Sequence, residues 1–120
     1  MVDFRLSEEQ VMIRDMAREF CDEEVIPNAE EWDKSGTYPL DAISKAHELG
    51  LLNVTIPEKY GGAGMSTVDE IIICEELSRG DPGFGTASYH TMLASFPILT
   101  GGTEEQKSEY LGRVASGKLA

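Results

Sequence analysis

Three helix-start signals of the same kind divide this chain and most constrain what it can fold into. Each is a capping box, in which a serine or threonine hydroxyl accepts from a backbone N–H three residues on and that residue's side chain bonds back. The boxes are Ser7 with Gln10, Ser66 with Asp69 or Thr67 with Glu70, and Thr103 with Gln106. No segment shows the alternation typical of a half-buried strand. The sequence therefore predicts an all-α domain of five to six helices with short connections.

Apolar residues at helical spacing extend the first start over residues 6–27, where a proline ends or kinks the helix. Pro39 is expected as the first residue of the next helix, and Gly50 as its left-handed C-terminal residue. The stretch 51–57 is apolar but too short for periodicity to decide, and we expect extended chain that crosses a buried surface.

Two consecutive segments, 67–80 and 84–99, are apolar on most of their sides. The first, TVDEIIICEELSRG, is expected to be the central helix, and the second, FGTASYHTMLASFPIL, to be buried on most faces. Pro97 removes one backbone hydrogen bond and should kink this second helix. A slender apolar group would then fit beside it, although tight helix packing explains its small residues equally well.

The charge balance argues against two kinds of partner. The chain has 22 acidic and 10 basic residues and a net charge of −12, so phosphate backbones and anionic lipids repel it. We expect no nucleic-acid partner and, without a long apolar run, no membrane insertion. Cys21 and Cys74 lie in apolar helical patterns and are expected to be free thiols. No signal-peptide pattern is seen, so a cytoplasmic location, or the mitochondrial matrix in a eukaryote, is expected.

No catalytic or metal-binding group can be assembled from the sequence. His90 has no second ligand at metal-binding spacing, so a core or pocket-lining role is expected. Ser88 and Ser95 have no base beside them. The adjacent Glu75 and Glu76 should belong to a solvated or ion-paired helix face. We therefore expect neither a catalytic residue nor a metal ligand.

The stretch PEKYGGAGMS, residues 57–66, raises the question of a phosphate-binding loop. Its glycines, Gly61, Gly62 and Gly64, lack the spacing of a dinucleotide-binding or P-loop motif. We expect a sharp turn in which Gly61 and Gly62 take positive φ and the backbone approaches another surface closely.

The order of these motifs resembles the N-terminal helical domain of the flavin-dependent acyl-CoA dehydrogenases. The resemblance rests on FRLSEEQVMIRDMAREFCDEEVIPNAEEWDKSGTYP, AHELGLLNVTIPEKYGGAGMSTVDEIIICEELSRGDPG and GGTEEQKSEYLGRVASGKLA, in this order. It covers essentially the whole chain. It implies that residues 1–120 are this N-terminal domain, and that the family's middle β domain and C-terminal helical domain are absent from the sequence.

The resemblance implies an oxidoreductase of fatty acid β-oxidation that dehydrogenates acyl-CoA thioesters between Cα and Cβ with FAD. A base removes the α-proton, the flavin accepts the β-hydride, and electrons pass to an electron-transferring flavoprotein. The family's catalytic glutamate and most flavin contacts lie in the absent part, so this chain alone should be inactive and hold no FAD. The implied partners are acyl-CoA, the electron-transferring flavoprotein, and the remaining domains and subunits of a homotetramer.

In this family the helix that matches SYHTMLASFPIL forms part of the acyl-pocket wall. The resemblance therefore implies substrate-binding, length-selecting roles for Tyr89, His90, Leu93, Phe96 and Pro97. Two alternatives stay open. One is a flavin monooxygenase or nitroalkane-oxidising relative with the same N-terminal fold, and the other is a standalone helical module that binds a partner protein.

Overall fold

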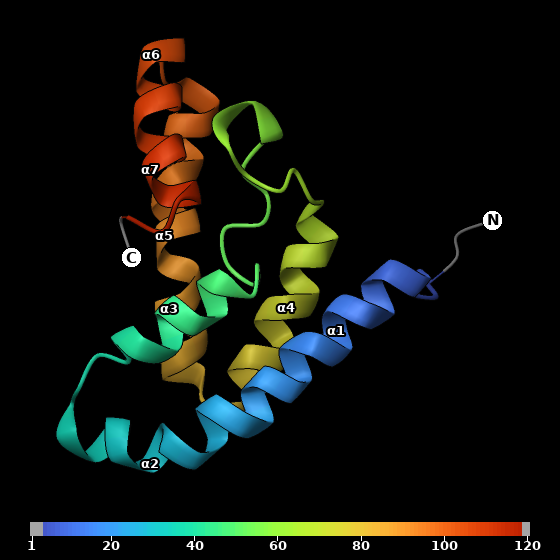
Figure 1. The fold of residues 1–120 in the computed structure, drawn as a ribbon, viewed down its shortest axis with the longest axis vertical. Coiled ribbons are helices and arrows are strands. Elements are labelled where there is room, and N and C mark those ends of the chain that lie inside the picture. The colour runs from blue at the N-terminus through green and yellow to red at the C-terminus, as the bar shows by residue number, and fades with distance from the viewer. Residues whose placement is uncertain (1–3, 119–120) are drawn as a thin grey trace.

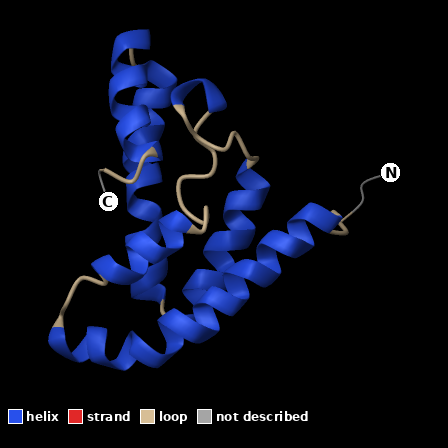
Figure 2. Cartoon of the chain, in the orientation of Figure 1, coloured by secondary structure: helices blue, strands red, loops and turns tan. Residues whose placement is uncertain are grey.

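The computed structural model describes residues 4–118, and every regular element in these residues is helical (Figure 1 and Figure 2). The first run consists of α1 (Glu8–Phe20), the π-helical turn η1 (Cys21–Val25) and α2 (Ile26–Ser35). It is followed by α3 (Leu40–Glu48), the 3₁₀ turn η2 (Glu58–Tyr60), α4 (Thr67–Gly80) and α5 (Pro82–Gly101). The last run consists of α6 (Glu104–Gln106), the π-helical turn η3 (Lys107–Leu111) and α7 (Gly112–Ala115). The predicted all-α fold is confirmed.

All three predicted capping boxes are present. The hydroxyls of Ser7 and Thr103 accept from the backbone N–H groups of Gln10 and Gln106 at 3.1 and 3.2 Å. At the start of α4 the hydroxyl of Ser66 accepts from the N–H of Asp69 at 3.3 Å, and the carboxylate of Asp69 bonds back. The alternative box with Glu70 does not form, which leaves that carboxyl group for another role.

Two proline predictions need correction. Pro27 lies in the first turn of α2, where a missing N–H breaks no helical bond, so the helical run continues through it to Ser35. Pro39 precedes α3 as its N-cap and is not its first helical residue. The predicted end of α3 is confirmed, because Gly50 has φ +72° and the N–H of Leu51 donates to the carbonyl of Ala46 at 3.0 Å.

The segment from Leu51 to Ile56 is buried at several positions, as predicted, but it is a series of bends and turns and not extended chain. Asn53 takes a left-handed conformation, with φ +56°, which a regular extended segment cannot contain. The N–H of Met65 donates to the carbonyl of Val54 at 2.9 Å and ties the segment to the start of α4.

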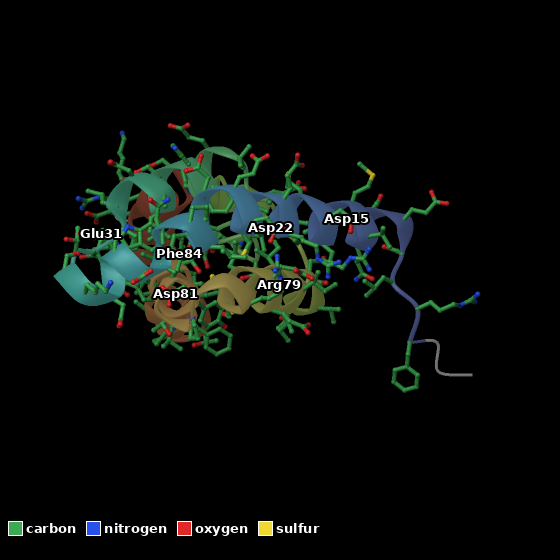
Figure 3. All side chains as sticks on the ribbon, turned by 90° about the horizontal axis from the view of Figure 1, so that it is seen from below. Asp15, Asp22, Glu31, Arg79, Asp81 and Phe84 are labelled. Atoms are coloured by element: carbon green, nitrogen blue, oxygen red, sulfur yellow. The ribbon has the colours of Figure 1, made fainter. Side chains whose placement is uncertain are left out.

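The larger core lies where α4 packs between α1 and α5, which confirms α4 as the central helix. Phe84 is fully buried at the start of α5, and its ring lies 5.6 Å from Trp32 and 6.2 Å from Phe20. Figure 3 shows Phe84 beneath the run of α1 and α2. A smaller core joins η2, α5 and the last helical run, through Ile56, Tyr60, Met92, Leu111 and Val114. Cys21 and Cys74 are free thiols, as predicted.

The prediction that α5 is buried on most faces is wrong. Leu93 and Phe96 of this helix are 65% and 58% exposed, and Ile71 of the neighbouring α4 is 59% exposed. The domain measures 42 × 42 × 20 Å, so it is about two helix layers thick and each helix keeps an outer side. None of the helices in residues 4–118 is long and apolar enough to cross a membrane.

Candidate functional site

The glycine loop does not form a phosphate cradle. The N–H groups of Gly61, Gly62 and Gly64 donate to the carbonyls of Glu58, Pro57 and Ile56 at 2.8, 3.2 and 2.9 Å. These donors are therefore used within the loop and do not converge on a ligand. The residues present do not fit the phosphates of a dinucleotide.

The positive-φ prediction for this loop is right for Gly61 and wrong for Gly62. Gly61 and Gly64 have φ of +87° and +64°. Gly62 is required for close approach, because a Cβ at this position would lie 2.0 Å from the carbonyl oxygen of Ile56.

Four of the five expected substrate-binding residues share one side of α5. Tyr89, Leu93, Phe96 and Pro97 follow one another at helical spacing and are all exposed. Tyr89 is the least exposed of the large apolar side chains on this side, at 37%. The structure thus brings together an outer apolar surface with one polar atom, the Tyr89 hydroxyl.

His90 lies apart from this surface. Its ring makes an edge contact with Tyr38, with the ring centroids 6.2 Å apart, and its Nδ1 pairs with the carbonyl of Ala87. It also lines a small cavity with His47 of α3, yet its side chain is exposed. Of the predicted roles, pocket-lining therefore describes His90 better than core. No group of three or more potential metal ligands occurs among the described residues.

Between α4 and α5 lies a cavity of about 10 Å³, beneath Tyr89. It is lined by the apolar residues of both helices and by a few polar groups. The polar lining residues are Asn53, Glu70, Ser88 and Tyr89. A space of this size holds one water molecule or one polar atom of a ligand.

Glu70 is the residue of this site that the sequence analysis missed. Its side chain is only 8% exposed, its Oε2 accepts from the Thr55 hydroxyl at 3.3 Å, and its Oε1 is buried without a hydrogen-bond partner. Burial raises the pKa of the Glu70 carboxyl, against the smaller effect of the Thr55 hydrogen bond. The available signal was an acid directly before three isoleucines, once Asp69 is assigned to the cap.

The other buried carboxylate of α4, Glu76, has a structural environment. Arg18 of α1 donates to its two oxygens at 3.0 and 2.6 Å, and Arg79 donates at 3.3 Å. The hydrogen bonds from Arg18 hold the pKa of Glu76 below its usual range. Arg79 also bonds Asp22, and Figure 3 shows these two residues facing each other across the helices. The predicted ion-paired role is confirmed for Glu76.

Fold and site together define a helical domain that offers a shaped wall and has no catalytic constellation among the described residues. Residues 7–118 match the family model of the acyl-CoA dehydrogenase N-terminal domain, so the chain belongs to the acyl-CoA dehydrogenase family.

Three similar proteins show how the chain relates to this family. It is 44% identical over 115 residues to a probable medium-chain specific acyl-CoA dehydrogenase 2, mitochondrial, of Caenorhabditis briggsae, covering 96% of this chain and 28% of that protein. The glutaryl-coenzyme A dehydrogenase complex with glutaryl-CoA superposes with a TM-score of 0.87 at 31% identity, covering 98% and 31% of the two chains. A structure described as the electron transferring flavoprotein of Acidaminococcus fermentans superposes with a TM-score of 0.84 at 40% identity, covering 97% and 31%. The chain spans less than a third of each of these proteins.

Proposed function

We propose that residues 1–120 act as the N-terminal α-helical domain of an FAD-dependent acyl-CoA dehydrogenase. The five outermost residues, 1–3 and 119–120, lie outside the described part of the chain. The single observation that carries the proposal is the family match over residues 7–118. Relatives with acyl-CoA dehydrogenase in their names support this activity over that of a flavin monooxygenase, a nitroalkane-oxidising enzyme or a standalone interaction module.

In this proposal the exposed side of α5 forms part of the wall of the acyl pocket. Leu93 and Phe96 are large, apolar and more than half exposed, which is the property expected of a surface that a further domain or a substrate covers. Tyr89 and Pro97 share this side, whereas His90 would act from its edge near Tyr38. These residues would select the acyl chain length and take no part in the chemistry.

The flavin would be held mainly outside these residues, because the N–H groups of the glycine loop are already bonded within the loop. The proposed partners are the acyl-CoA substrate, the other domains and subunits of a homotetramer, and an electron-transferring flavoprotein as electron acceptor. The proposed location is the cytoplasm, or the mitochondrial matrix in a eukaryote, and one relative's name includes "mitochondrial". This chain alone is expected to bind no flavin and to be inactive.

The test is to express the complete product of the gene and assay it with saturated acyl-CoA thioesters of increasing length. We expect α,β-dehydrogenation with an artificial electron acceptor, and a changed length preference in Leu93→Ala and Phe96→Ala. Met12→Ala is the matched control, since Met12 is 71% exposed on α1. An unchanged preference in both variants would refute the pocket assignment. A reading frame that stops at Ala120, with no acyl-CoA turnover, would instead favour the interaction module.

A further inference from the structure

Glu70 combines deep burial with an oxygen that nothing in the described residues satisfies. Its single printed contact is the Thr55 hydroxyl on Oε2, and this hydroxyl also lies 3.1 Å from the sulfur of Met92. Buried polar atoms in native proteins normally have a partner, and exceptions often mark a site for water or a ligand. The orphaned oxygen therefore requires a functional explanation.

No cation compensates this carboxyl group. The one arginine of α4, Arg79, lies at the other end of the helix and bonds Glu76 and Asp22. No ion pair to Glu70 occurs in residues 4–118. A buried carboxyl without a counter-charge keeps its proton more readily, and as a neutral acid it can both donate and accept a hydrogen bond.

The cavity next to Glu70 connects it to the proposed pocket wall. Glu70 and Tyr89 line the same space of about 10 Å³, and Tyr89 belongs to the exposed side of α5. Glu70 and Cys74 both act electrostatically on the Tyr89 hydroxyl and, with burial, raise its pKa, which places these groups close together. A group that approaches α5 beside Tyr89 is therefore near Glu70 as well.

We infer that Glu70 and the cavity beneath Tyr89 form a polar subsite for one neutral oxygen, a hydroxyl or carbonyl carried on the acyl chain. This inference rests on the proposed function of the domain. Glu70 would then be a specificity-determining residue. An aliphatic chain leaves its Oε1 unpaired, whereas a hydroxyl or carbonyl oxygen satisfies it. A second carboxylate is rejected by charge, in a chain whose net charge is already −12.

The experiment compares three CoA thioesters of equal chain length in the complete enzyme: one aliphatic, one with a distal hydroxyl and one with a terminal carboxylate. Sites built to bind a polar substrate group discriminate strongly against analogues that lack it. We expect kcat/KM of the wild type to favour the hydroxyl compound over the aliphatic one by at least about tenfold. In Glu70→Leu this preference should disappear.

Two further variants separate specificity from folding. Glu70→Gln keeps the size and the hydrogen-bonding groups but cannot ionise, so the hydroxyl preference should remain while the carboxylate compound is accepted better. Glu75→Leu makes the same change at an exposed neighbour on α4 and should leave all ratios unchanged.

Unchanged ratios in Glu70→Leu, in an enzyme that oxidises aliphatic acyl-CoA, would overturn the subsite and leave the proposed function standing. A wild-type enzyme without hydroxyl preference would overturn it in the same way. Absence of turnover with all three compounds would overturn both. A crystal structure of the hydroxyacyl complex with only water beside Glu70 would also overturn the subsite.

Discussion

The two ends of α4 each bury a carboxyl group, and the fold treats the two groups in opposite ways. Glu76, at the end that packs on α1, is bound by Arg18 and Arg79. Glu70, at the end that packs on α5, has one hydroxyl contact and one unpartnered oxygen. Both side chains are equally buried, so exposure does not explain the difference. The comparison shows that α4 is fixed to the domain at one end and keeps a polar group unpaired at the other.

The largest effect should come from removing the ion-paired carboxylate. Glu76→Gln leaves the guanidinium of Arg18 without its charged partner and weakens two hydrogen bonds between α1 and α4. Because Arg18 is half exposed and can regain water, we expect a loss of about 2–3 kcal/mol in the free energy of unfolding. Urea unfolding of the wild type and the variant measures this loss. The exposed Glu75→Gln is the control, and equal midpoints for both variants would contradict the structural role of Glu76.

The same experiment at the other end should have the opposite sign. Glu70→Leu removes the buried oxygen without a partner and forfeits only the 3.3 Å contact with Thr55. Replacing an unsatisfied buried polar group with an apolar one relieves its desolvation cost, so we expect the variant to be more stable by about 1–2 kcal/mol. A destabilised Glu70→Leu would mean that Oε1 has a partner in solution, such as an ordered water. The sign of the change therefore tests the comparison directly.

The pH dependence of stability should separate the two groups further. Burial raises the pKa of Glu70 in the folded chain, so its contribution is present below the usual glutamate pKa and is lost as the pH rises through the raised value. The pKa of Glu76 is lowered, so its contribution is present above the usual range and is lost as the pH falls through the lowered value.

Glu70→Gln should therefore flatten the stability curve on the alkaline side of the usual glutamate pKa, and Glu76→Gln on its acidic side. We expect each change to be about 1 kcal/mol or less over one pH unit, because a single titrating group sets the slope. Urea midpoints measured across this range provide the data. Identical curves for the two variants would show that the groups titrate alike.

Local chemistry made much of the fold predictable, and tertiary packing decided what was not. The caps at Ser7 and Thr103 and the turn at Gly50 depend on neighbouring residues, so their sequence patterns were sufficient. At Ser66 and Thr67 two capping boxes overlap by one residue, and only the structure shows which acid remains for the interior. The exposure of Leu93 depends on the thickness of the whole domain, which periodicity does not encode.

The smallest effect should come from the one contact that Glu70 does have. Thr55→Val replaces the hydroxyl with a methyl group of similar size, so Glu70 loses its hydrogen bond and its pKa should rise further above the usual range. At 3.3 Å this bond is long, and we expect a change of about 0.5–1 kcal/mol or less in the free energy of unfolding. An NMR titration of the Glu70 side chain in wild type and Thr55→Val measures the shift, and Glu76, which does not contact Thr55, serves as the internal reference. A Glu70 pKa that falls in the variant would show that water replaces the hydroxyl and hydrates the carboxylate. The end of α4 beside α5 would then be wet, and the contrast with the ion-paired end would be one of solvation and not of missing partners.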